Sequence, residues 1–168
     1  MKITVFALGV LALLCACASA ACANGDEAGP WLRDLYGKKR VTHGDVFLAA
    51  ALVSDDKTWH ADPKWAQKVC DRRGYMRTKP YKGLKANARR GYAAMVFARL
   101  LDIDGGLWSR IFNQPPRYAY RELVTLGMIA PGGSDVPLSG DELAGLLLAA
   151  ERYRKVGPER LPLRGAVQ

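Results

Sequence analysis

The chain has 168 residues and a formal net charge of +9, and 49% of its residues are apolar. Once an N-terminal segment is removed, about 145 residues remain, enough for one domain with a sizeable core. The chain has four cysteines and no C-x-x-C pair, which excludes a disulfide-rich scaffold.

The N-terminus predicts export. Lys2 precedes an apolar run over 3–14, which is too short to span a bilayer and is typical of a signal peptide. Small residues follow, so we expect a signal peptide over 1–23 with cleavage after residue 16, 20 or 23. The segment Leu14-Cys15-Ala16-Cys17 resembles a bacterial lipobox, in which Cys17 would receive lipid. Two locations therefore stay open, a soluble protein in the periplasm and a lipoprotein anchored in the membrane at the cell envelope.

The rest of the chain predicts an all-α fold, because apolar residues recur at helical spacing and strand signals are weak. We expect a helical repeat domain over 31–154, preceded by a tether over 24–30 and followed by a loose basic tail over 155–168. Thr42 with Asp45, and Ser139 with Glu142, have the spacing of helix-capping boxes. In chain order, the expected helices cover 31–36, a segment beginning at 43, 63–73, about 88–101, 116–127 and 140–154.

Two of these helices are copies of one pattern. Residues 63–76 read PKWAQKVCDRRGYM and residues 116–129 read PRYAYRELVTLGMI. Each copy opens with a proline in its first turn and closes with a glycine, at an offset of 53. Cys70 aligns with Leu123, so we expect it to be a core residue. Repeated units of this kind cannot bury an apolar face alone and must pack on their neighbours.

The positive charge is concentrated in one segment. Between Lys64 and Arg90 there are ten basic residues, and only Asp71 opposes them. Such a field attracts polyanions. Nucleic acid would be the ordinary partner for a basic patch, but export argues against it. The expected partners are anionic wall polysaccharide, peptidoglycan carboxylates or the acidic face of an envelope protein.

The order of these parts resembles that of S-layer homology domains. That family's unit is a helix that opens with a Trp-Ala-like pair and closes with glycine, then a loop, then a second helix that begins with a Thr-Arg-x-Glu-like box. The first helix is matched by 65–75 and 118–128, and the box by 88–91, 139–142 and 41–45. The resemblance covers about 31–154 and implies helix-loop-helix repeats packed as a small bundle.

The resemblance also implies a function, which is attachment to an anionic polysaccharide of the cell wall. Carried over by position, the box arginine corresponds to Arg89 with Arg90. His43 and Gly140 stand where the other two boxes would have arginine, so those positions depart from the pattern. The predicted ligand-binding residues are these two arginines, three basic residues of the first repeat helix and one tryptophan. We expect the tryptophan to be exposed and to stack on sugar. The full set is Arg89, Arg90, Lys64, Lys68, Arg72 and Trp59.

No residue pattern predicts catalysis. The two histidines, His43 and His60, have no partner at metal-ligand spacing, and we expect His43 to be solvated in the first turn of its helix. The sequence therefore predicts no metal, no cofactor and no enzyme activity. Two alternatives remain, a protein-interaction scaffold or accessory subunit of an envelope complex, and a wall hydrolase without a visible catalytic set.

Overall fold

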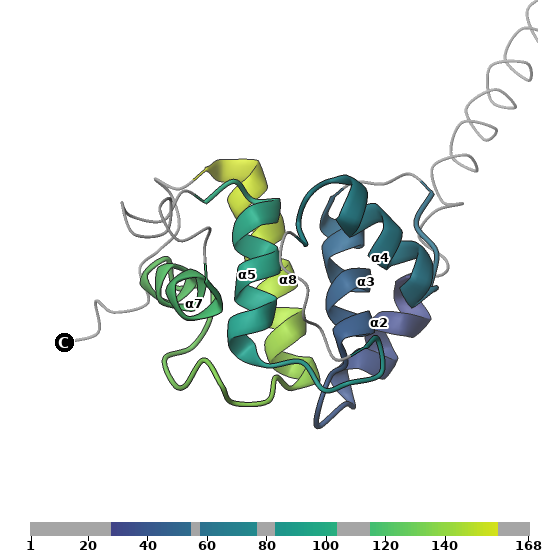
Figure 1. Ribbon diagram of the computed structural model, residues 1–168, viewed down its shortest axis with the longest axis horizontal. Coiled ribbons are helices and arrows are strands. Elements are labelled where there is room, and N and C mark those ends of the chain that lie inside the picture. The colour runs from purple at the N-terminus through teal and green to yellow at the C-terminus, as the bar shows by residue number, and fades with distance from the viewer. Residues whose placement is uncertain (1–27, 55–57, 77–82, 104–114, 158–168) are drawn as a thin grey trace, which may run out of the picture.

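The computed structural model describes residues 28–54, 58–76, 83–103 and 115–157, and over these residues the protein is all-α (Figure 1). The expected signal peptide and Cys17 lie outside the described residues. None of the helices in the described ranges is long and apolar enough to cross a membrane. The helices, in chain order, are α2 (Ala28–Tyr36), α3 (His43–Val53), α4 (Pro63–Arg72), α5 (Arg90–Leu100), α7 (Pro116–Thr125) and α8 (Gly140–Val156).

The helices form three successive pairs, which we call units: α2 with α3, α4 with α5, and α7 with α8. The first helix of each unit packs on the second helix of the preceding unit, so that α4 packs on α3 and α7 packs on α5. The pattern closes on itself, because α2 packs on α8. The second helices meet in the middle, where α3 contacts both α5 and α8, and Figure 1 shows α3, α5 and α8 between the outer helices α4 and α7.

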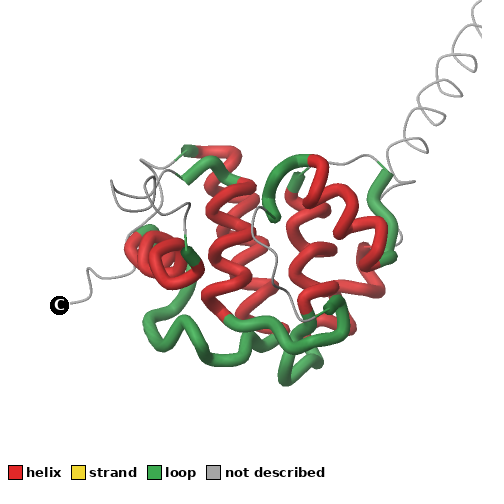
Figure 2. The backbone as a smooth tube through the Cα atoms, in the orientation of Figure 1, coloured by secondary structure: helices red, strands yellow, loops and turns green. Residues whose placement is uncertain are grey.

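The loops that precede α3, α5 and α8 gather at one end of the bundle, along the lower edge of Figure 2. A ring of three backbone hydrogen bonds joins them. The amide of Val41 donates to Leu138 (3.0 Å), that of Leu138 donates to Ala88 (3.0 Å), and that of Ala88 donates to Val41 (2.9 Å). All three residues are buried. In each unit a loop carbonyl therefore accepts a hydrogen bond from a loop amide of the following unit. None of the three loops is an independent turn.

Capping boxes begin two of the three central helices, as the sequence predicts. The Thr42 hydroxyl accepts from the amide of Asp45, and the Asp45 carboxylate accepts from the amide of Thr42. Ser139 and Glu142 make the same pair of bonds at α8. The third central helix, α5, has Arg89 at its N-cap and no side-chain cap.

A side chain in the first helical position (N1) of one central helix meets the third position (N3) of the next. His43, at N1 of α3, stacks on Tyr92, at N3 of α5, with ring centroids 4.4 Å apart. Arg90, at N1 of α5, forms an ion pair with Glu142, at N3 of α8. These side-chain contacts join units that the backbone ring also joins, but Arg90 donates to the following unit, whereas each backbone amide of the ring donates to the preceding one.

We call each of these contacts between an N1 and an N3 position a junction. The third junction, between α8 and α3, is built differently, because N1 of α8 is Gly140. Its amide donates to the carbonyl of Lys38 (2.8 Å). The Lys38 ammonium then supplies the missing cation to Asp45, at N3 of α3, at 2.9 Å. A methyl group on Gly140 would overlap the carbonyl oxygen of Leu35. The end of α2 and the residues after it therefore approach α8 so closely that only glycine fits at this position.

The repeated helices α4 and α7 have matching ends. Each begins with proline and is followed by a glycine with positive φ, +74° at Gly74 and +69° at Gly127. The aligned residues Cys70 and Leu123 are both fully buried, which confirms the expected core position. Burial raises the pKa of the Cys70 thiol to about 12, so this cysteine is not a thiolate at neutral pH.

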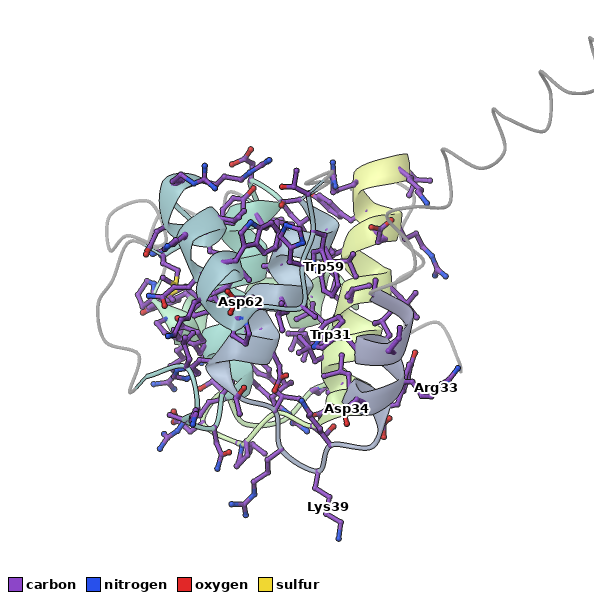
Figure 3. All side chains as sticks on the ribbon, turned by 90° about the vertical axis from the view of Figure 1, so that its right-hand side faces the viewer. Trp31, Arg33, Asp34, Lys39, Trp59 and Asp62 are labelled. Carbon is purple, nitrogen blue, oxygen red and sulfur yellow. The ribbon has the colours of Figure 1, made fainter. Side chains whose placement is uncertain are left out.

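Four expectations from the sequence are wrong. Helix α2 begins at Ala28, inside the expected tether. Trp59 is not exposed: only 7% of it is accessible, its indole N–H donates to the carbonyl of Leu48 (3.2 Å), and its ring packs against Trp31 (Figure 3). His43 is not solvated either, because Tyr92 covers its ring and only 7% of the residue is accessible. Helix α8 also continues to Val156, so the expected tail is helical in its first two residues.

The close approach at Gly140 gives a stability prediction. Gly140→Ala should destabilise the domain by about 1–3 kcal/mol, because the added methyl group must push the end of α2 and Lys38 away from α8. Urea denaturation followed by circular dichroism would measure the change. Gly145→Ala is the matched control, since it lies in the same helix with nothing within 4 Å of the added atom, and it should stabilise by about 0.5–1 kcal/mol. Equal effects of the two substitutions would contradict the proposed packing.

Candidate functional site

A groove of about 820 Å³ lies beside the first turn of α5, where all three units meet. The first unit contributes His43, the second contributes the 86–92 segment, and the third contributes the start of α7 and the loop before α8. The residues that line it are His43, Ala86, Asn87, Ala88, Arg89, Gly91, Tyr92, Pro115, Pro116, Arg117, Ser134, Asp135 and Pro137.

Two stacked rings lie at one wall of this groove. Tyr92 is half-buried and lies nearly parallel to His43, with an angle of 25° between the ring planes. Phe47 packs edge-on against Tyr92 with centroids 6.2 Å apart, and the Tyr92 hydroxyl contacts the sulfur of Met76 at 3.6 Å. The Tyr92 ring is therefore held in one orientation at the edge of the groove.

The charges around the groove sum to +1 when His43 is neutral. Arg89 and Arg117 are exposed and positive, and Asp135 is exposed and negative. The Arg89 guanidinium lies 3.3 Å from the Asp135 carboxylate, and the Arg89 side chain is 61% accessible. An exposed pair of this kind contributes little stability, so a competing anion can take the place of Asp135 on Arg89 at low cost.

The backbone of the α5 first turn shapes the rest of the groove. The amides of Arg90 and Gly91 donate to the carbonyls of Val136 (3.0 Å) and Ser134 (2.8 Å) in the loop before α8. A Cβ on Gly91 would come within 3.1–3.3 Å of Ser134 and Pro116, so glycine allows α7 and this loop to approach. The N-terminus of α5 has no side-chain cap, and these two loop carbonyls accept from its first amides instead.

Burial keeps His43 neutral. With only 7% of the residue accessible, desolvation lowers the pKa of its imidazole below the ordinary value. At neutral pH the ring therefore contributes no charge to the groove.

The structure separates the residues that the sequence grouped into one basic face. Arg89 lines the groove. Arg90, its neighbour, turns away to Glu142, with 18% of its side chain accessible, and this ion pair raises the pKa of the guanidinium. Lys64, Lys68 and Arg72 lie at successive exposed turns of α4, and none of them lines the groove. We call these three residues the α4 ridge.

Sequence analysis missed Arg117, Tyr92, Asp135 and His43 as groove residues. Arg117 could have been found, because it is the repeat mate of Lys64 at the offset of 53. The other three come from different units, and nothing in their spacing indicates that they meet. Among the described residues, no group of three or more His, Cys, Asp and Glu side chains could hold a metal ion.

Comparison of the chain with protein-family models, with curated proteins and with solved structures found no match. The resemblance to S-layer homology repeats is therefore a proposal.

The two neighbouring arginines should differ in their effect on stability. Arg90→Ala should lower the free energy of unfolding by about 1–2 kcal/mol, because it removes a partly buried, charge-assisted contact between two units. Arg89→Ala should change it by less than about 0.5 kcal/mol, because its partner is exposed. Urea denaturation of both variants would test this; a larger loss for Arg89→Ala would contradict the assignment.

Acidification should weaken the fold through His43. The unfolded chain takes up a proton on this residue as the pH falls through about 6.5, while the folded state resists it until a lower pH. The stability contributed by neutral His43 is therefore present above about pH 6.5 and is lost below it. Thermal unfolding between about pH 7.5 and pH 5 should show this loss, and His43→Gln should reduce it. His60→Gln is the control and should leave the pH dependence unchanged.

Proposed function

We propose that this protein is a non-catalytic binding module that attaches to an anionic polymer of the cell envelope, either wall polysaccharide or peptidoglycan, with an architecture like that of S-layer homology repeats. The observation that carries the proposal is the groove at the meeting point of the three units. It combines two exposed guanidinium groups, Arg89 and Arg117, with the fixed ring of Tyr92. Guanidinium groups bind carboxylate or phosphate through paired hydrogen bonds, and the Tyr92 ring borders the space that such a ligand would occupy.

The proposal gives the groove no catalytic role. Its carboxylate is that of Asp135, which is exposed and paired with Arg89. Its imidazole is buried against Tyr92 and held neutral. The N-terminal sequence supports export, and in the anchored form Cys17 would carry the lipid that holds the module near the wall.

A second candidate function uses the α4 ridge. Lys64, Lys68 and Arg72 lie four residues apart on one exposed helix, away from the groove. A row of cations along one exposed helix suits the acidic face of an envelope protein. In this alternative the domain is a scaffold or accessory subunit of an envelope complex.

Sedimentation with purified peptidoglycan sacculi, with and without their attached polymers, would separate the two functions. Arg89→Gln/Arg117→Gln removes two charges from the groove, and Lys64→Gln/Lys68→Gln removes the same number from the α4 ridge. The fraction that pellets should fall at least about tenfold for the groove variant and should change little for the ridge variant. The reason is that direct contacts in the groove contribute more to the binding free energy than the overall positive charge of the protein. Raising the salt well above about 0.15 M should weaken the binding of the unaltered protein.

The matched loss of charge makes the result interpretable. Equal losses in both variants would mean that net charge alone governs binding. No pelleting of the unaltered protein under any condition would overturn the polymer proposal and favour a protein partner for the α4 ridge. Circular dichroism of each variant would establish that the fold is retained.

A further inference from the structure

His43 occupies a position from which its charge would act directly on an anion in the groove. It is a lining residue, it begins α3, and its ring lies flat on Tyr92. It is also the N1 residue of its unit, the position at which Arg90 carries a permanent charge in the second unit. Histidine at this position replaces a permanent charge with one that depends on pH.

When His43 is neutral, the charged groups around it give the groove a net charge of +1. Arg89 faces it from the start of α5, Arg117 from the start of α7, and Asp135 from the loop before α8. On its own helix, Asp45 is already held by Lys38 and by Thr42. A proton on His43 would therefore raise the charge around the groove from +1 to +2. The protonated ring can stay in place, because a cation over the face of Tyr92 is itself a favourable arrangement.

We propose that His43 makes the groove a pH-dependent anion site, which binds an acidic glycan more tightly as the pH falls below neutral. This inference rests on the proposed binding function of the groove. Its physical basis is reciprocal linkage: if the imidazolium attracts the bound anion, then the bound anion must stabilise the imidazolium by the same free energy. A groove whose only cations were arginines would bind a carboxylated sugar equally well at neutral pH and at a pH below neutral.

Nuclear magnetic resonance of the two imidazole rings would test the inference directly. The chain has two histidines, so each ring can be followed by its own signals and His60 serves as an internal reference. The probe is hexagalacturonate, whose carboxylates stay ionised above about pH 5. We expect the probe to raise the pKa of His43 and to leave that of His60 unchanged. This measurement uses the unaltered protein and does not depend on a variant that folds.

The affinity for the probe supplies the second readout. Between about pH 7.5 and pH 5 the dissociation constant should fall by at least about fivefold, the lower end of ordinary coupling between two sites. His43→Gln should remove this change with pH. His60→Gln should keep it. Arg89→Gln should weaken binding at both pH values.

The possible outcomes are distinguishable. Binding that does not vary with pH, or a pH dependence that persists in His43→Gln, would overturn the role of His43 and leave the proposed function standing. No binding of hexagalacturonate at either pH, with no change in any resonance of the groove, would overturn both. A rise in the pKa of His43 on binding, together with a loss of pH dependence in the glutamine variant, would support both.

Discussion

Three backbone hydrogen bonds join Val41, Ala88 and Leu138 into a closed ring, and the arrangement of the units depends on it. A single hydrogen bond of this kind contributes only about 1 kcal/mol net. The ring has a larger effect on geometry, because it fixes where the three central helices begin relative to one another. Their first turns then lie side by side, and contacts between N1 and N3 residues become possible. The groove is a consequence of this placement and needs no loop of its own.

The three junctions share one backbone plan and differ in the side chains that fill it. An ion pair closes the junction between α5 and α8, and Lys38 closes the one between α8 and α3. The junction between α3 and α5 instead has two stacked rings and lies beside the groove. An acid at N3 stabilises a helix start, and α5 has Tyr92 there instead. The helix that lacks this support is the one whose first turn lines the groove.

Local signals predicted the fold well. The capping residues Thr42 and Ser139, and the prolines and glycines that bound α4 and α7, act within one turn of helix, so the sequence shows them directly. The site was harder to predict, because its contacts join residues far apart in the chain. Arg90 and Arg89 look alike in sequence, and only the position of Glu142, 52 residues away, distinguishes them. Trp59 follows a polar segment, and only the carbonyl of Leu48 and the ring of Trp31 explain its burial.

The sharing of each junction between two units limits how this repeat can evolve. In an array whose units carry their own complete contacts, a unit can be duplicated, deleted or moved without harm to its neighbours. Here the partner of each N1 residue belongs to the following unit, so His43 requires the tyrosine of the second unit and Arg90 requires the glutamate of the third. A copy of the second unit inserted after itself would place Arg90 opposite Tyr92 and open the closed ring. The side chains between the units therefore constrain the order and number of the units in this domain.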